Sequence, residues 1–358
     1  MVNIAINGYG RIGRVAHRII LEQHLHEASV VAINAGSSTD LEGWMYLLKY
    51  DTMYRPLPNF KLGIKKPEEK PLPFQTTAEF LGYLVIDSNE IPVFADRDPK
   101  NLPWRDLKVD VVIESTGAFT TEEKMKPHLE SGAKSVILSA PFKDEETGET
   151  FVIGVNLDKN GGKLPQIISN ASCTTNCISP VAKVIQNTFG IEKAMMTTIH
   201  SYTSDQSLQD GGHKDYRRAR AAAQNIIPTS TGATKAAAIA IPELKGIFDG
   251  LAIRVPTAVG SLSDFTFLVK RDTTVEEVNK AIEDAANTDA MRGILRVTHD
   301  PIVSSDIIGD PHSAIADLSL TQVVGGNMVK VIAWYDNEFG YSNRLVEETI
   351  LLGRQFSS

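Results

Sequence analysis

Cysteine is the scarcest chemistry-bearing residue of this chain. Only two cysteines occur in 358 residues, Cys173 and Cys177. A pair at that helical spacing cannot build a disulfide framework, so we expect a reducing compartment, the cytoplasm. The amino-terminal segment 1–6 lacks a basic stretch followed by a long apolar one, which argues against a secretory signal peptide.

Long apolar runs and an excess of positive charge are also missing. No run approaches the roughly 20 residues of a transmembrane helix, so we expect no membrane partner. The formal net charge of -8 disfavours a nucleic-acid surface. We also expect no metal site. With 42% hydrophobic and 22% charged residues, the chain has the composition of an ordinary globular protein, and its length suggests two domains.

Strand-like and helix-like segments alternate in the first half of the chain. Strands are expected at 2–6, 30–33, 109–114, 135–138, 151–155 and 167–168. Helices are expected at 11–23, at 41–50, and after the capping-box pattern Thr120-Thr121-Glu122-Glu123. This alternation predicts an α/β domain with a mostly parallel sheet covered on both faces.

The pattern changes after about residue 190. Longer strands are expected at 194–199, 251–255, 265–269, 294–297 and 328–335, with helices at 231–241, 274–286 and 338–355. We therefore predict a second, α+β domain with an antiparallel or mixed sheet, and domain limits of 1–172 and 173–337. The long aperiodic stretch 201–228 is typical of a functional loop. The proline-rich segment 56–73 is interpreted as a solvated surface loop.

A glycine motif, Gly8-x-Gly10-x-x-Gly13, follows the first strand and opens the first helix. The glycines permit a tight turn and close approach to a pyrophosphate, which the helix start attracts. In this context the motif predicts a Rossmann-type nucleotide-binding domain.

The end of the second strand lacks the acidic residue that would bind the adenosine ribose. The chain reads Asn34-Ala35-Gly36-Ser37-Ser38-Thr39 there. Without a carboxylate, a 2′-phosphate meets less repulsion. We therefore expect NADP to be accepted and preferred, with NAD as the alternative cofactor. Asp40 could instead supply the carboxylate, but its place ahead of an apolar helical pattern favours a helix N-cap.

The segment from Ser169 to Cys177, Ser-Asn-Ala-Ser-Cys-Thr-Thr-Asn-Cys, joins a strand to a helix. A helix start lowers a thiol pKa, and the thiolate is the nucleophile. Three neighbouring hydroxyl residues favour a reactive Cys173 over an inert buried thiol. Cys177, one turn later, is interpreted as packed.

This nine-residue segment resembles the active-site signature of phosphorylating glyceraldehyde-3-phosphate dehydrogenases. The resemblance covers essentially the whole chain, from residues 7–14 to residues 334–341. It implies a homotetramer that oxidises glyceraldehyde 3-phosphate with NAD(P) and inorganic phosphate to 1,3-bisphosphoglycerate, in glycolysis or gluconeogenesis. It also implies that the loop 201–228 lines the cofactor site of a neighbouring subunit, and that a last helix at about 338–358 packs on the nucleotide domain.

The resemblance further implies the roles of individual residues. Cys173 would be the nucleophile, and His200 would stabilise its thiolate and act as a base. The expected cofactor residues are Asn7, Gly8, Gly10, Arg11, Ile12, Gly13, Asn34, Ala35, Arg97, Thr116, Gly117, Ser139, Asn337 and Tyr341. The expected phosphate-ester site holds Thr203, Asp205, Arg218 and Arg254. The expected inorganic-phosphate site holds Ser172, Thr174, Thr231 and Gly232, with Arg254 between the two.

Further sequence features bear on the choice between NAD and NADP and on the alternative functions. Gly211-Gly212 replaces the family's usual Leu-Pro before His213-Lys214, which again makes room for NADP. An erythrose-4-phosphate dehydrogenase, with water as the final nucleophile, is the second candidate function, and a nucleotide-binding sensor without turnover is the third. The Tyr-Thr at 202–203 and the Thr-Ser-Thr-Gly at 229–232 favour the phosphorylating type, and intact Cys173 and His200 argue against a sensor.

Overall fold

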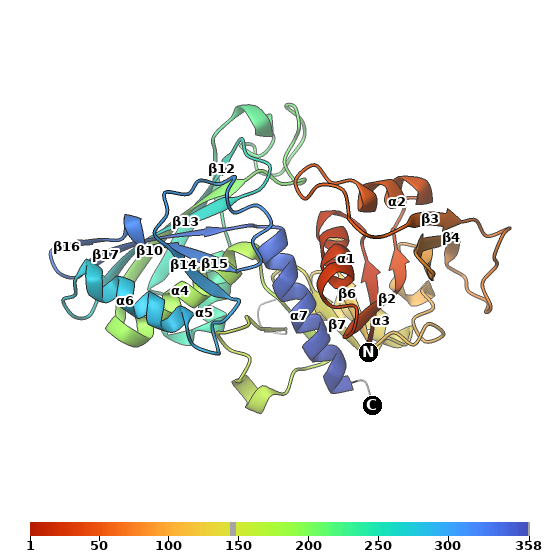
Figure 1. Ribbon diagram of the computed structural model, residues 1–358, viewed down its shortest axis with the longest axis horizontal. Helices are drawn as coiled ribbons and strands as arrows, with labels where there is room; N and C mark the ends of the chain where they lie inside the picture. Colours follow the sequence, from red (N-terminus) through yellow and green to blue (C-terminus); the bar gives the residue numbers. More distant parts are fainter. Residues whose placement is uncertain (144–147, 357–358) are drawn as a thin grey trace. The chain divides into compact units, whose positions relative to one another are not determined.

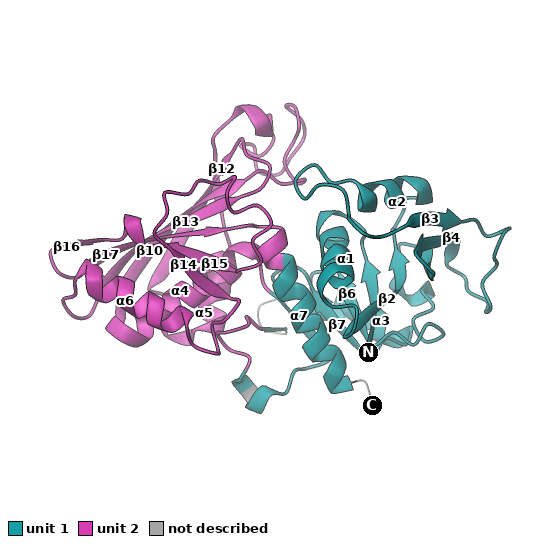
Figure 2. Ribbon diagram, in the orientation of Figure 1, with its two compact units in different colours: residues 1–150, 158–170, 342–358 teal, residues 151–157, 171–341 magenta. Residues whose placement is uncertain are grey.

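The structure is a computed structural model that describes residues 1–143 and 148–356 (Figure 1). The chain forms two compact units (Figure 2). The first consists of residues 1–150, 158–170 and 342–358, and the second consists of residues 151–157 and 171–341. The expected boundary after residue 172 compares with one after residue 170. Residues 151–157, expected in the first domain, belong to the second unit, as do the first residues of the last helix. The final residues of the expected last helix, 357–358, lie outside the described residues.

A nine-stranded sheet forms the first unit within the described residues, in the order β3-β4-β5-β2-β1-β6-β7-β9-β8. The strands are β1 Val2–Asn7, β2 Ala28–Asn34, β3 Leu62–Lys65, β4 Glu79–Ile86, β5 Asn89–Ala95, β6 Val111–Glu114, β7 Ser135–Leu138, β8 Glu149–Thr150 and β9 Ile167–Ser169. Pairing is parallel from β5 to β8 and antiparallel in β3–β4 and β4–β5. Because β6 and β7 are buried at every residue, both faces of the sheet are covered, as expected for an α/β domain.

Capping side chains set the helix starts of this unit. Its helices are α1 Arg11–Gln23, α2 Leu41–Lys49, α3 Glu122–Glu130 and most of α7 Phe339–Phe356, with 3₁₀ turns η1 Pro99–Asn101 and η2 Lys159–Gly162. Asp40 Oδ1 accepts from the Gly43 N–H at 2.8 Å, which confirms Asp40 as the N-cap of α2. The Thr121 hydroxyl accepts from the Lys124 N–H at 3.4 Å, which confirms the expected start of α3.

Two expectations for this half of the chain are wrong. Residues 151–155 form a turn rather than a strand, because the Asn156 side chain accepts from the Val152 N–H at 2.7 Å and closes the backbone locally. The apolar character of the run reflects burial instead, since Phe151 and Val152 are fully covered. The segment 56–73 is not wholly a loop, since β3 pairs with β4. The sequence analysis also missed the β4–β5 hairpin.

The second unit holds a mixed sheet, eight-stranded within the described residues, in the order β11-β12-β10-β13-β17-β15-β14, with β16 beside β17. The strands are β10 Ile191–Ser201, β11 Ile227–Ser230, β12 Phe248–Val255, β13 Ser261–Val269, β14 Leu295–Thr298, β15 Ala314–Asp317, β16 Gln322–Val324 and β17 Met328–Tyr335. The helices are α4 Cys173–Phe189, α5 Ala233–Ala240 and α6 Val275–Ala286, with 3₁₀ turns η3 Ala222–Gln224, η4 Pro242–Leu244 and η5 Leu318–Leu320. The predicted mixed sheet is confirmed.

Alternation along the strands decides which face of this sheet is buried. In β13 every second residue is buried, and Phe265 and Phe267 stack with their ring centroids 5.3 Å apart. The helices α4, α5 and α6 lie on the covered face (Figure 1). Across the described residues, no helix is both long and apolar enough to cross a membrane.

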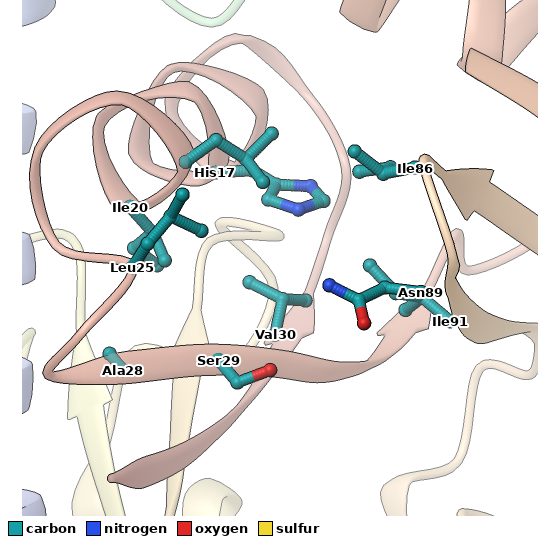
Figure 3. Close-up of a pocket in the computed structure, with 10 residues that line it drawn as sticks. His17, Ile20, Leu25, Ala28, Ser29, Val30, Ile86, Asn89 and Ile91 are labelled. Carbon is teal, nitrogen blue, oxygen red and sulfur yellow. The ribbon is translucent and has the colours of Figure 1, made fainter. Parts of the chain in front are cut away.

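A small cavity of about 30 Å³ lies in the first unit, lined by residues of α1, β2 and the β4–β5 hairpin (Figure 3). It has room for about one water molecule. His17 points toward it, and burial lowers the pKa of His17 to about 3, so the ring is neutral. The Tyr9 hydroxyl lies 2.7 Å from His17 Nδ1, while Nε2 has no partner among the described residues.

Glu348 is a buried acid in α7 and is 0% exposed. With the Asn170 amide nitrogen facing the carboxyl group, Asn170 donates to Glu348 Oε2 at 2.7 Å. No described residue bonds Glu348 Oε1. Burial raises the pKa of Glu348 well above its ordinary value of 4.5, so folding favours the protonated form of this carboxyl.

We predict that Glu348→Gln stabilises the protein increasingly as pH rises from 5 to 8. The unfolded chain releases the Glu348 proton above its ordinary pKa, while the folded chain retains it, so wild-type stability falls as pH rises through this window. Glutamine does not titrate. The gain should therefore increase at each step in pH above the ordinary value of 4.5. Denaturant unfolding at several pH values measures it, with the exposed Glu68→Gln as control; a pH-independent difference would refute the buried-proton argument.

Candidate active site

The turn between β1 and α1 carries the glycine motif. Gly8 has a φ of 95°, and a Cβ there would lie 2.6 Å from the Thr116 backbone nitrogen, so only glycine fits. Gly10 is the N-cap of α1 and offers no side-chain cap, and the first turn of α1 has no acidic residue. These features suit an anion at the helix start. The Arg11 side chain pairs with Asp51 rather than projecting freely.

The other expected cofactor residues of this unit divide into buried and exposed groups. Asn7 and Asn34 are 1% and 2% exposed, and Asn34 Nδ2 donates to Asn7 Oδ1 at 2.6 Å. Their side chains therefore bond to each other beneath the surface. The more accessible members are Ile12, Ala35, Arg97, Thr116, Gly117 and Ser139, whereas Gly13 is buried.

Cys173 is the first residue of α4, and the turn before it fixes its position. Ala171 adopts a left-handed φ of 55°, which costs a non-glycine residue on the order of 1–3 kcal/mol. The Tyr341 hydroxyl donates to the Ala171 carbonyl oxygen at 3.2 Å. Ser172 Oγ accepts from the Thr175 N–H at 3.1 Å and so caps the helix. This turn places Cys173, a half-buried residue, at the helix start.

His200, near the end of β10, faces that thiol. Its Nε2 lies 3.4 Å from the Cys173 sulfur, and its Nδ1 lies 2.7 Å from the Ser201 carbonyl oxygen. The carbonyl oxygen only accepts and is nearer to Nδ1 than the Arg254 Nη1 donor at 3.2 Å, so the proton is assigned to Nδ1 and Nε2 offers a lone pair to the thiol. A base that is to take the thiol proton requires this tautomer.

Burial sets the resting charge of both groups. It raises the pKa of the Cys173 thiol, and the Arg254 guanidinium acts in the opposite direction. Burial, followed by the Arg254 charge, lowers the pKa of His200 to about 3. The resting pair is therefore a neutral thiol against a neutral imidazole. The expectation that the helix start lowers the thiol pKa is wrong here, because desolvation outweighs it.

Arg254 reaches the site through strand register. The parallel β10–β12 pairing sets Arg254 opposite His200. Arg254 Nη1 donates to the Ser201 carbonyl oxygen and to Thr203 Oγ1, both at 3.1 Å. Burial lowers the pKa of Arg254 below its ordinary value, yet a guanidinium stays charged near neutral pH. A fixed positive charge therefore lies directly beside the thiol–imidazole pair.

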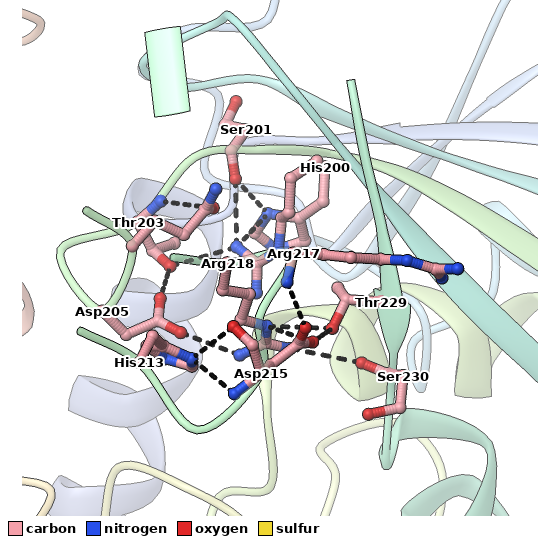
Figure 4. A network of polar contacts seen from close by, with 12 residues as sticks. His200, Ser201, Thr203, Asp205, His213, Asp215, Arg217, Arg218, Thr229 and Ser230 are labelled. Carbon is pink, nitrogen blue, oxygen red and sulfur yellow. Dashed lines mark hydrogen bonds and ion pairs between the residues drawn. The ribbon is translucent and has the colours of Figure 1, made fainter. Parts of the chain in front are cut away.

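Arg218 extends this positive region (Figure 4). Its Nη1 donates to Asp205 at 2.8 Å and its Nε donates to Thr229 Oγ1 at 2.9 Å. Burial raises the pKa of Asp205, but the Thr203 hydroxyl and the charges of Arg254 and Arg218 outweigh it and hold that pKa below its ordinary value. The structure thus brings together all four residues expected for the phosphate-ester site. Two guanidinium groups beside hydroxyls suit a phosphate.

The residues expected for inorganic phosphate are more scattered. Ser172 caps α4, and the buried Thr174 places its hydroxyl 3.0 Å from the Tyr335 hydroxyl. Thr231 Oγ1 accepts from the Ala233 N–H at 3.2 Å at the start of α5, and Gly232 is exposed there. No hydrogen bond between described residues joins Thr231 to the thiol site.

The two remaining cofactor residues belong to the second unit. Asn337 Oδ1 accepts from the Gly260 N–H at 3.1 Å and from the Ser261 hydroxyl at 3.0 Å. These bonds fix the amide orientation and leave its NH₂ group as the donor side. The hydroxyl of the buried Tyr341 bonds the Ala171 carbonyl.

Sequence reasoning missed Tyr335. Its hydroxyl lies 2.7 Å from Thr198 Oγ1 as well as 3.0 Å from Thr174 Oγ1, and its ring meets the His200 ring edge-on at 6.0 Å. Burial raises the pKa of this phenol, so it remains a neutral hydrogen-bonding group. A tyrosine ending an apolar strand gave no signal of this contact, because the partners lie on α4 and β10.

Comparison with known proteins agrees with this geometry. Residues 2–122 match the family described as glyceraldehyde 3-phosphate dehydrogenase, NAD binding domain, and residues 172–337 match its C-terminal domain. Glyceraldehyde-3-phosphate dehydrogenase 2 of Streptomyces avermitilis is 48% identical over 354 residues, 99% of each chain. The glyceraldehyde-3-phosphate dehydrogenases of Mycobacterium leprae and Mycobacterium tuberculosis are 49% identical over 357 and 355 residues, again 99% of each chain. This chain therefore belongs to the glyceraldehyde-3-phosphate dehydrogenase family.

Proposed function

We propose that this enzyme is a phosphorylating glyceraldehyde-3-phosphate dehydrogenase. The observation that carries the proposal is the neutral Cys173–His200 pair, 3.4 Å apart, beside the paired guanidinium groups of Arg254 and Arg218. The pair supplies a nucleophile and a base for an aldehyde, and the arginines supply a place for its phosphate ester.

The chemistry begins when His200 Nε2 takes the Cys173 proton and the sulfur attacks the aldehyde carbon. The resulting oxyanion is stabilised by the Cys173 N–H at the start of α4 and by the imidazolium. The imidazolium returns that proton to the oxyanion, and His200 takes it back as the hemithioacetal carbon gives up a hydride, for which a bound dinucleotide would be the acceptor. The acyl group remains on the sulfur as a thioester, which inorganic phosphate attacks. The Cys173 thiolate leaves, and an acyl phosphate is released.

The glycine turn fits a dinucleotide. The dinucleotide supplies the hydride acceptor of the reaction. We assign Gly8, Gly10 and the α1 start to its pyrophosphate, because they combine close backbone approach with a helix dipole. Asn337 is assigned to the nicotinamide carboxamide, with its NH₂ group as donor.

The direct assay follows reduction of NAD and of NADP by glyceraldehyde 3-phosphate, with and without inorganic phosphate. We expect turnover to require phosphate. Turnover that proceeds equally well without phosphate would favour the erythrose-4-phosphate type, and absence of turnover with both cofactors would favour the sensor.

We also propose a homotetramer in the cytoplasm, with NADP accepted and preferred. The long segment 201–228 carries exposed Leu208, Tyr216 and Ile226, which are 83%, 86% and 71% exposed in the single chain. Apolar exposure on this scale is typical of a surface covered by a partner. Light scattering at working concentration should report four protomers, and a monomer would contradict the assembly. Both cysteines are free thiols, in keeping with a reducing compartment.

Cys173→Ser should abolish turnover while dinucleotide binding remains, because serine is a far weaker nucleophile at neutral pH. Cys177→Ala should retain most activity, since Cys177 is 0% exposed and packs in the core of the second unit. Initial rates and calorimetric binding measure both variants. Equal loss of turnover in the two variants would refute their separate roles.

His200→Asn should slow the iodoacetamide alkylation of Cys173 near neutral pH and lower kcat by roughly 10²–10⁴, the usual contribution of a general base. Asparagine cannot hold the thiol proton at the position of Nε2. His299→Asn, at an exposed histidine paired with Glu283, serves as control. Unchanged alkylation together with unchanged kcat would make His200 structural.

Ala35→Asp should weaken NADP by at least about tenfold, because a carboxylate beside a 2′-phosphate costs more than roughly 1.4 kcal/mol. Ala35 directly follows β2 and is partly exposed, so a larger side chain can be accommodated at this position. NAD should be weakened little or should bind better. Ala35→Asn is the uncharged control and should change the NADP/NAD ratio of kcat/KM much less. A ratio unmoved by aspartate would make Ala35 a neutral turn residue.

A further inference from the structure

Buried polar side chains form a continuous hydrogen-bonded chain at the carboxyl edge of the first unit's sheet. Glu114, which ends β6, and His128, in α3, are both 0% exposed. Trp104 Nε1 donates to His128 Nδ1 at 3.0 Å, and His128 Nε2 lies 3.2 Å from Glu114 Oε2. An indole N–H only donates, so His128 Nδ1 carries no proton and its Nε2–H donates to Glu114.

Glu114 connects this chain to the ends of two neighbouring strands. Its Oε2 also accepts from Asn7 Nδ2, and its Oε1 accepts from the Thr116 N–H at 2.8 Å and from the Thr116 hydroxyl. Asn7 Oδ1 in turn accepts from Asn34 Nδ2 at 2.6 Å. Every group that bonds Glu114 is a donor, so the charged carboxylate is the form that fits.

The segments held in this way are those of the proposed dinucleotide site. Asn7 immediately precedes Gly8, whose turn lies against Thr116 so closely that a Cβ would meet the Thr116 nitrogen at 2.6 Å. Asn34 ends β2 at the turn expected to meet the adenosine ribose. Glu114 therefore connects three turns: those after β1 and β6 by direct hydrogen bonds, and the one after β2 through Asn7. Its own side chain is fully buried.

The charge of Glu114 is not required by packing. A buried carboxylate is costly, and among the described residues no lysine or arginine forms an ion pair with it. An apolar side chain of similar volume would avoid this cost. What the carboxylate adds is a set of four directed hydrogen bonds that join separate backbone turns.

We propose that Glu114 is a positioning residue for the dinucleotide, with His128 held as a neutral donor by Trp104. It fixes the three turns in their binding arrangement and so sets cofactor affinity, without touching the cofactor or the reacting atoms. This inference rests on the proposed dinucleotide-dependent function.

Calorimetric binding of NAD and NADP to full-length variants tests the proposal. The NH₂ group of Glu114→Gln faces Asn7 and His128 in one orientation and the Thr116 N–H in the other, where only the Thr116 hydroxyl can turn to accept, so at least one of the four hydrogen bonds is lost. We expect the dinucleotide Kd to rise at least about tenfold. The cofactor KM should rise in parallel, while kcat at saturation and the alkylation rate of Cys173 stay within about twofold.

Matched variants separate positioning from general stability. His128→Leu removes the donor to Glu114 and should weaken binding, whereas His128→Gln keeps an N–H donor and should restore part of it. Asp110→Asn changes another buried carboxylate, at the opposite end of the same strand, where it accepts from the Asn3 N–H at 2.8 Å. Thermal melting checks that each variant is folded. If Glu114→Gln does not fold, the comparison of His128→Leu with His128→Gln provides the test.

Two results would overturn the inference alone: unchanged dinucleotide affinity in folded Glu114→Gln and His128→Leu, or an equal loss of affinity in Asp110→Asn. Wild-type protein that binds neither NAD nor NADP would overturn the proposed function, and this inference with it.

Discussion

The contact between the Cys173 sulfur and His200 Nε2 is the interaction on which the proposed chemistry of this protein depends. The two residues are 27 positions apart and come from different elements, the start of α4 and the end of β10. The strained turn at Ala171 and the Ser172 cap place the sulfur, and the Ser201 carbonyl fixes the imidazole tautomer. Burial favours the neutral form of both groups, so in the proposed mechanism the thiolate forms only when its proton moves to the ring.

Strand ends also position other polar groups of the protein. Arg254 lies beside His200 because β12 runs parallel to β10 in matching register. Asp205 and Thr229 orient Arg218 without neutralising the region fully, since Arg254 contributes a second positive charge. In the first unit, Glu114 ends a strand in the same way and bonds the turns of its neighbours. A polar side chain at a strand end is ordered by the sheet and still reaches a turn.

Two errors of the sequence-based predictions come from the effect of burial, one on a polar group and one on an apolar run. A helix start lowers a thiol pKa in water, but the desolvation of Cys173 reverses the sign. The apolar run at 151–155 was interpreted as a strand, although Phe151 and Val152 are buried in a turn that the Asn156 side chain closes. The phosphate role expected for Thr174 stays a prediction, since its buried hydroxyl lies 3.0 Å from the Tyr335 hydroxyl and 4.0 Å from the Cys173 sulfur.

Local patterns in the sequence determined the parts of this protein whose physics is local. Strand and helix periodicity, the Asp40 and Thr121 caps, the glycine turn at Gly8 and the cysteine at a helix start depend on neighbours within a few residues. Tertiary structure alone decided the contacts between elements that are distant in sequence. These are the Tyr335 contact with Thr174, the register of Arg254 with His200, and the Trp104–His128–Glu114 hydrogen-bonded chain. Sheet pairing and burial bring such residues together from distant positions, and no short-range spacing records them.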